Sequence, residues 1–382
     1  MISLFRQLAL LIVLSMVLVA CGGAPVAQPP AAAPTNAPAS PVAPTVMPTS
    51  AAPAATAGTS DGTLTVNDDL GRAVTLPATP QRIVSLAPSV TEILFAVGAG
   101  PQVVGDTKFC NYPPEAKALP KIGGFSAKSI SVEAVVGLKP DLVIAGTASQ
   151  KPVVESLEAL KVPVLVLAPS SFDAVYTSIQ QIGAVTGHAA QAEQVISQMR
   201  ERVEAVTAKI AGIPAAERPK VFWEVSDDPL ITSGPNTFIG QMITLAGATN
   251  IFADAAENYP TVSAEAVIER NPPVILGPAS QSDKLSAAVL KARPGWSDIQ
   301  AVRDGRVYLL DDEITSRPGP RLADGLEALA TALYPAQFGA AAAAGGFPLT
   351  VENCGVSQTF SAPPQRAVAM NQAATEVMLA LG

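Results

Sequence analysis

The stretch ISVEAVVGLKPDLVIAG at Ile130–Gly146 has a close match in VSAEAVIERNPPVILGP at Val262–Pro278. Both begin with a Ser where a helix N-cap belongs, followed by a Glu in the first helical turn, an apolar run, a Pro and an apolar strand. The match predicts the same helix–strand unit in each half of the chain. We therefore expect two similar lobes.

The two first-turn glutamates are Glu133 and Glu265. Unpaired N–H groups and the positive end of the helix dipole favour a carboxylate at a helix start, so each Glu can serve only to stabilise its helix. Their matching places in two lobes also suggest one acidic surface point per lobe.

The rest of the chain follows the same alternation. Strands alternate with helices through residues 61–172 and again through 212–335, which predicts two lobes with parallel sheets. Residues 173–211 contain no Pro and repeat apolar residues on one helix face, which predicts a backbone helix that Gly187 can break. The expected fold class is α/β: two Rossmann-like lobes joined by one long α-helix, with a ligand cleft between them.

Two local features add detail. Ser89 and Glu92 match a capping box at the start of a helix in the first lobe. Cys110 and Cys354 fall in different parts of the chain, so we expect no disulfide within a domain.

Composition excludes several function classes. The 382 residues carry a formal net charge of −8, which argues against a nucleic-acid partner. One His and three Cys are poor material for a metal site built by the protein. The lone His188 has no Ser or Cys motif linked to it, and no phosphate-binding or zinc motif occurs. We therefore expect neither an enzyme nor a bound cofactor or metal.

The N-terminus carries targeting signals. Residues 1–20 have one early cation and then an apolar run, which is typical of a secretory signal. The run ends at Cys21 in LVACGG, which resembles a bacterial lipobox and implies that Cys21 is lipidated; the alternative is an ordinary signal with an incidental Cys. Residues 21–60, rich in Ala, Pro and Thr, are expected to form a tether. The folded part would then be exported and lipid-anchored, facing the periplasm or the cell exterior.

The C-terminal residues repeat the entrance of the first lobe. After an Ala/Gly-rich linker at 336–348, LTVENCGVSQTF matches LTVNDDLGRAVTL, and PQRAVAMNQAATEVMLALG matches PQRIVSLAPSVTEILFAVG. We interpret residues 349–382 as the truncated start of a second such domain, either a tandem partner or a gene fragment.

The order of lipobox, tether, lobe, helix and lobe resembles the substrate-binding lipoproteins of ABC importers, in the class whose two lobes are joined by a rigid backbone helix. The resemblance covers about residues 64–335 and is most similar to the vitamin B12 receptor branch. The motifs that carry it are RIVSLAPSVTEILFAVGAG, VVGDTKFCNYPPEAKALPKIGGF, VEAVVGLKPDLVIAG, PLITSGPNTF, AGATNIF and SRPGPR.

The resemblance implies a function and its surfaces. A monomer would capture cobalamin, or a related metal chelate, between the lobes and deliver it to a permease dimer. Glu133 and Glu265 would dock onto permease arginines, since charge-assisted pairs set orientation. An iron–siderophore or haem receptor of the same class is the alternative, and a surface lipoprotein without a transport role is a remote one.

The resemblance also implies which residues line the cleft. They are the aromatics Phe109, Phe125 and Tyr259, with Ile231 where the B12 receptor has an aromatic, and the charged Glu313 and Arg317. Each aromatic can instead be core filler, and the charged loop can be solvated, with Arg321 pairing locally. A haem receptor would need an axial ligand, for which Tyr112 and Tyr259 are the candidates.

Overall fold

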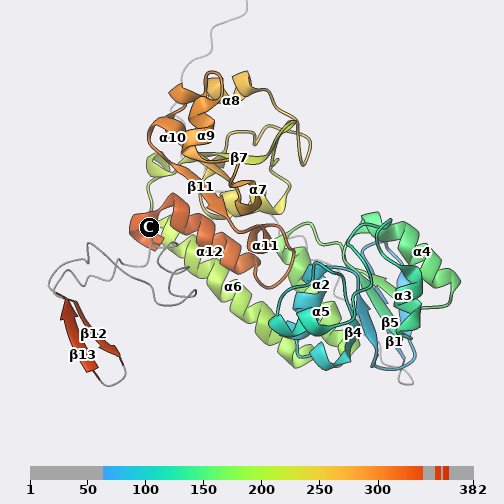
Figure 1. Cartoon of the computed structure of the whole chain (residues 1–382). Coiled ribbons are helices and arrows are strands. Elements are labelled where there is room, and N and C mark those ends of the chain that lie inside the picture. Colours follow the sequence, from blue (N-terminus) through green and yellow to red (C-terminus); the bar gives the residue numbers. More distant parts are fainter. Residues whose placement is uncertain (1–62, 339–348, 354–355, 361–382) are drawn as a thin grey trace, which may run out of the picture. The chain divides into compact units, whose positions relative to one another are not determined.

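Two separate parallel-strand sheets organise the part of the chain that the computed structural model describes, residues 63–338, 349–353 and 356–360 (Figure 1). This confirms the α/β fold class. The predicted secretory signal, with Cys21, the predicted tether and most of the predicted linker lie outside the described residues.

The first lobe holds a four-stranded, all-parallel sheet of order β4-β3-β5-β6, preceded by an antiparallel hairpin, β1–β2. Its strands are β1 Leu64–Asn67, β2 Ala73–Leu76, β3 Ile83–Ser85, β4 Val103–Gly105, β5 Leu142–Ala145 and β6 Val164–Val166. Its helices are α2 Pro88–Ala96, α3 Val132–Gly137, α4 Lys151–Ala159 and α5 Phe172–Thr186.

The second lobe holds a five-stranded sheet of order β11-β10-β7-β8, with β9 also pairing with β7. All pairs are parallel except β7–β8, which is antiparallel. Its strands are β7 Lys220–Asp227, β8 Leu230–Thr232, β9 Thr249–Asn250, β10 Val274–Pro278 and β11 Val307–Leu310. Its helices are α7 Phe238–Leu245, α8 Ala264–Arg270, α9 Ala287–Ala292, α10 Gln300–Arg303, α11 Asp312–Thr315, α12 Leu322–Leu333 and α13 Pro335–Phe338.

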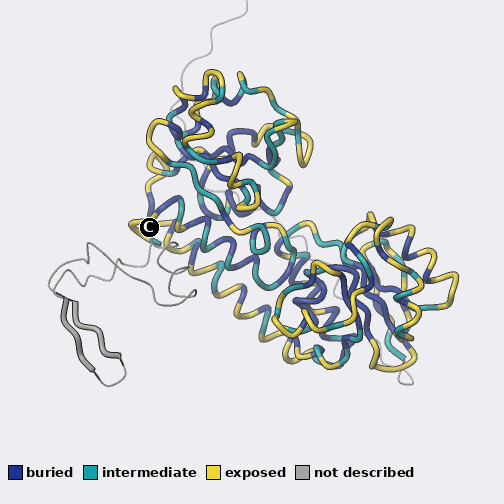
Figure 2. Tube along the Cα trace, in the orientation of Figure 1, coloured by how far each residue is buried: buried dark blue, intermediate teal, exposed yellow. Residues whose placement is uncertain are grey.

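The central strands are buried on both faces. Every residue of β3, β5 and β6 is buried, as expected where helices cover both sides of a parallel sheet (Figure 2). One hydrophobic core passes from Leu94 of α2 to Leu326 of α12 through residues of α5 and of α6, Ala189–Ala211. The two lobes therefore share apolar packing along the helices between them.

The predicted backbone segment at 173–211 is two helices, α5 and α6. Gly187 adopts the left-handed conformation, with φ of 80°, at the C-terminal end of α5, and the His188 N–H donates to the Gly183 carbonyl at 2.7 Å. Of the two, α6 contacts α2 and α5 in the first lobe and α7 and α12 in the second (Figure 1). Helix α6 thus joins the lobes, while α5 packs beside it.

The capping box predicted at Ser89 and Glu92 is wrong. Helix α2 begins two residues earlier than that motif requires, with Ala87 as N-cap and Pro88 in the first turn. No side chain caps this end, and the Glu92 carboxylate is buried and reaches the second lobe instead.

The C-terminal strands fit the internal repeat. Strands β12, Leu349–Asn353, and β13, Val356–Phe360, pair antiparallel, as β1 and β2 do in the matching stretch. The second part of the repeat, from 361 to 382, lies outside the described residues, as does Cys354. No helix of the described part is long and apolar enough to cross a membrane.

Candidate functional site: a cavity between the lobes

A cavity of about 710 Å³ opens between the two lobes. Its first-lobe wall includes Gly146, which directly follows β5, and its second-lobe wall includes Asp311, which directly follows β11. These positions lie at the carboxyl ends of parallel strands, where open α/β sheets bind ligands. The full lining is Pro88, Ser89, Phe109, Phe125, Gly146, Ser280, Asp311, Asp312, Glu313, Ser316, Arg317 and Pro318.

Two of the predicted aromatics face this cavity. Phe109 is 49% exposed and Phe125 is 40% exposed, although large apolar side chains are usually buried. Tyr259 is also exposed, but neither it nor Ile231 is among the residues that line the cavity. The structure therefore brings Phe109 and Phe125 together and leaves Tyr259 and Ile231 outside.

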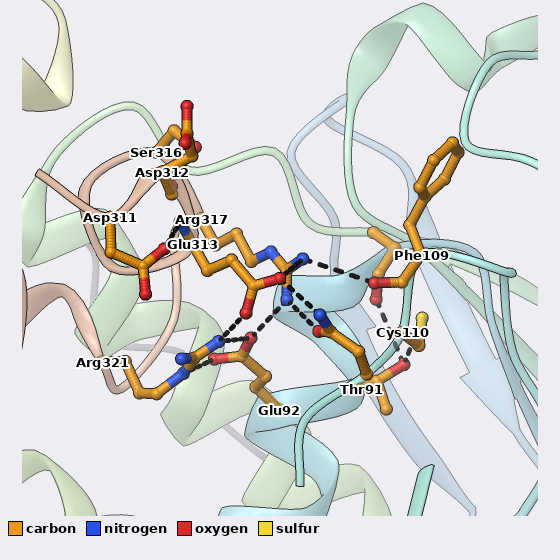
Figure 3. A network of polar contacts seen from close by, with 12 residues as sticks. Thr91, Glu92, Phe109, Cys110, Asp311, Asp312, Glu313, Ser316, Arg317 and Arg321 are labelled. Atoms are coloured by element: carbon orange, nitrogen blue, oxygen red, sulfur yellow. Dashed lines mark hydrogen bonds and ion pairs between the residues drawn. The ribbon is translucent and has the colours of Figure 1, made fainter. Parts of the chain in front are cut away.

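Glu313 and Arg317 line the cavity as predicted, but the Arg317 guanidinium is already engaged by protein acceptors (Figure 3). Its Nη1 lies 3.2 Å from Glu92 Oε1 and 2.8 Å from Asn111 Oδ1, and its Nη2 lies 2.8 Å from Glu313 Oε1. Asn111 also donates to Glu313.

Arg321 completes this group across the lobes. Its Nε and Nη2 donate to the two oxygens of Glu92 at 2.9 and 2.7 Å, and its guanidinium stacks 4.1 Å from the centre of the Tyr112 ring. Arg321 also pairs locally, with Glu313 at 3.4 Å, but its main partner is Glu92 in the other lobe. We call Glu92, Asn111, Glu313, Arg317 and Arg321 the Glu92 cluster.

Two members of the cluster, Glu313 and Arg321, have shifted pKa values. Burial alone would raise the pKa of Glu313, but hydrogen bonds from Asn111 and the charges of Arg317 and Arg321 outweigh burial and lower it. The hydrogen bond to Glu92 is the main cause that raises the pKa of Arg321. Sequence reasoning missed Glu92 because its motif fits a helix start equally well.

Most of the charged side chains that line the cavity are acidic. Asp311, Asp312 and Glu313 contribute three carboxylates against the single guanidinium of Arg317. The Asp312 carboxylate accepts the Ser280 N–H at 3.0 Å and the Ser280 hydroxyl at 2.8 Å. The lining side chains thus carry an excess of negative charge.

The predicted helix starts are confirmed in both lobes. The Ser131 hydroxyl accepts from the Ala134 N–H at 3.1 Å at the start of α3, and Ser263 accepts from Ala266 at 3.2 Å at the start of α8. The neighbouring carboxylates, Glu133 and Glu265, are exposed, and neither forms an ion pair within the described residues. Hydrogen bonds from its own backbone N–H and from Ser263 lower the pKa of Glu265.

Residues 83–314 match a family model described as periplasmic binding protein. The chain belongs to the periplasmic binding protein family. It is 37% identical over 280 residues, 72% of this chain and 87% of the relative, to an uncharacterized ABC transporter substrate-binding lipoprotein of Bacillus subtilis. It is 32% identical to a cobalamin-binding protein of Halobacterium salinarum, over 71% of this chain and 74% of that one.

A solved structure agrees with this family membership. The periplasmic haem-binding protein of Roseiflexus sp. RS-1, in its apo form, is 32% identical, with a TM-score of 0.60 over 67% of this chain and 99% of that one. The chain is therefore an exported substrate-binding protein of the ABC transporter class, and not an enzyme.

The Cys110 side chain of this periplasmic binding protein is buried in the first lobe. The Cys110 thiol is buried, lies 3.2 Å from the hydroxyls of Thr91 and Thr107, and has its pKa raised by burial. A buried neutral thiol of this kind is a packing residue. In the described part of the chain, no group of three or more His, Cys, Asp or Glu residues is placed to hold a metal ion.

Proposed function

We propose that this periplasmic binding protein captures a cobalamin-type corrinoid in the cavity between its lobes and delivers it to the permease of an ABC importer. The observation that carries the proposal is a cavity with two exposed aromatic rings and an acidic wall. Phe109 and Phe125 offer flat apolar faces, which suit packing against a macrocycle.

Charge favours a corrinoid over the other chelates of the class. The ring of cobalamin carries amide side chains, whose N–H groups can donate to the carboxylates of Asp311 and Glu313. Haem carries two propionates and catecholate siderophores are anions, so both would meet an excess of like charge. Arg317 does little to offset this negative charge, because its guanidinium group already pairs with Glu92, Asn111 and Glu313.

Haem has a second requirement that the cavity wall does not meet. Its iron needs an axial ligand such as His, Tyr or Met, and none of these residue types lines the cavity. Of the two tyrosine candidates, Tyr259 lies outside the lining and Tyr112 stacks against Arg321 in a different cavity. Haem is therefore the weaker alternative, although the similarity to a haem-binding protein keeps it in the test.

Calorimetric titration of the purified full chain tests the ligand. We expect heat with cyanocobalamin and a dissociation constant of about 1 µM or lower, with weaker or no binding of haemin and of a ferric tris-catecholate. Haemin or the catecholate binding more tightly than cyanocobalamin would overturn the corrinoid assignment. Absence of binding by all three would overturn the proposed function.

Substitution of the aromatics tests the cavity itself. Phe109→Ala and Phe125→Ala should each weaken cyanocobalamin binding about tenfold, because each removes a stacking face. Leu160→Ala is the matched control, since Leu160 is 56% exposed at the end of α4 and does not line the cavity. Equal effects at all three positions would argue against a binding role for the two rings.

The lipid anchor at Cys21 is a further part of the proposal. The apolar run before Cys21 and the similarity to a substrate-binding lipoprotein support it. We expect mass spectrometry of the mature protein to find acyl chains on Cys21. Cys21→Ser should release the protein from the membrane fraction, and an unmodified Cys21 in the wild-type protein would contradict the anchor.

A further inference from the structure

The Glu92 carboxylate is almost completely buried, which is unusual for a charged group near a ligand cavity. Its side chain is 1% exposed, and it faces two arginines of the other lobe, Arg317 and Arg321. It accepts one hydrogen bond from Arg317 and two from Arg321. A buried carboxylate is costly unless it is paired in this way.

Glu92 does not itself line the ligand cavity. It lines a second cavity of about 750 Å³, together with Tyr112 and Arg321, whereas Arg317 lines the ligand cavity. The Glu92 cluster is therefore the wall between two cavities. In Figure 3 the Arg317 guanidinium is turned toward Glu92 and the Phe109 carbonyl, while the Phe109 ring points away from the cluster. Glu92 can act on a ligand through the residues that it contacts, most directly through Arg317.

The cluster is balanced in charge. Two carboxylates, Glu92 and Glu313, face two guanidinium groups, Arg317 and Arg321. Removal of Glu92 would leave one positive charge in excess at the edge of the ligand cavity. A ligand anion could then supply the missing counterion, since guanidinium pairs readily with carboxylate.

We propose that Glu92 is a specificity-determining positioning residue: as an internal counterion it holds Arg317 and Arg321 and thereby excludes anionic chelates from the cavity. The inference rests on the proposed function and names the property of the ligand that the protein selects. With Glu92 in place, an incoming carboxylate meets satisfied arginines and the acidic side chains of Asp311 and Asp312.

Two corrinoids that share the same corrin ring but differ in charge test this proposal. Dicyanocobinamide carries amides around the corrin ring, and dicyanocobyrinic acid carries carboxylates there. The wild-type full chain should prefer the amide form. Glu92→Gln should lower the ratio of the two affinities about tenfold, by improving the binding of the acid, because one unit of charge changes beside the cavity. Glu92→Gln with Arg317→Gln should return the ratio toward the wild-type value.

Glu224→Gln is the matched control. Glu224 is also buried and accepts two hydrogen bonds at 2.7 Å from one arginine, Arg293, but it lies outside the ligand cavity. This variant should cost stability and leave the affinity ratio unchanged. If Glu92→Gln does not fold, Arg317→Gln alone tests the inference. It should shift the ratio of the two corrinoid affinities further toward the amide form.

The outcomes separate the two proposals. An unchanged ratio in Glu92→Gln, with both affinities falling together, would mean that Glu92 only holds the lobes and would overturn this inference alone. An unchanged ratio in Arg317→Gln would do the same. A wild-type protein that binds neither corrinoid would overturn the proposed function and this inference with it.

Discussion

Asp106 is a buried acid just before Phe109 in the chain. It follows β4, and its carboxylate is fully buried. Lys121 Nζ lies 2.6 Å from Oδ1, whereas Oδ2 has no hydrogen-bond partner in the described structure. Burial raises the pKa of Asp106 to about 6, against the opposing effect of Lys121.

The raised pKa of Asp106 predicts a pH-dependent stability. Because the folded pKa of about 6 is above the ordinary value of 3.8, the proton favours the folded state. This contribution is fully present below pH 3.8 and is lost as the pH rises through about 6. The loss is up to about 3 kcal/mol. Asp106→Asn should remove it, so its free energy of unfolding, measured with urea, should change less than that of the wild type between pH 4 and pH 7. Parallel profiles for the two proteins would contradict the raised pKa.

The structural role of a single residue could be predicted from the sequence only where its partners are close in the chain. Ser131 and Ser263 cap helices through N–H groups three residues away, so the local pattern was sufficient. Glu92 and Arg321 are 229 residues apart, and nothing in either motif indicates the other. The acidic residues Asp311, Asp312 and Glu313 are consecutive in the sequence, but only the structure shows that all three line the cavity between the lobes.

At the scale of elements, the close packing of α5 on α6 depends on a small residue. Periodic apolar residues predicted the helical segment, but they could not decide whether Gly187 ends a helix or lies within one. The structure ends α5 at Gly187 and packs Gly183 against α6, where an added Cβ would lie 2.3 Å from Ala192 Cβ. A Cβ at that distance must push the two helices apart.

Gly183→Ala should therefore destabilise the protein by about 1–3 kcal/mol, through overpacking between α5 and α6. Gly137→Ala is the matched control, since Gly137 is in α3 and an added Cβ would have no neighbour within 4 Å. That control should be neutral or stabilising by up to about 1 kcal/mol, because Ala is a better helix former than Gly. Urea unfolding followed by circular dichroism measures both. Equal midpoints would show that the helices can separate without cost.

At the scale of the whole molecule, the repeated helix–strand unit predicted two lobes, and the expected fold class placed a ligand cleft between them. Both predictions rest on rules of topology, which need no side-chain detail. Predicting which aromatic residues line the cavity did require side-chain detail. Tyr259 matched the family pattern in sequence as Phe109 and Phe125 did, yet its loop follows β9 and does not reach the cavity wall.

Docking to a permease is the property that needs both lobes at once. Glu133 and Glu265 are exposed first-turn carboxylates, each fixed to its lobe by a capped helix. Each is available for an intermolecular partner, because neither pairs within the described residues. Two fixed charges on two lobes can define one orientation on a partner that presents arginines at a matching spacing.

Glu133→Ala combined with Glu265→Ala should abolish uptake of labelled cyanocobalamin by cells that also carry the permease, while the purified variant keeps its ligand affinity. Each single variant should have a smaller effect, since one contact would still set part of the orientation. Glu155→Ala with Glu269→Ala is the control: it changes the net charge equally, at exposed residues of α4 and α8, and should support normal uptake. Lost uptake in both double variants would mean that overall charge, and not these two positions, governs docking. Lost ligand affinity in the first double variant would instead assign the two glutamates to ligand binding.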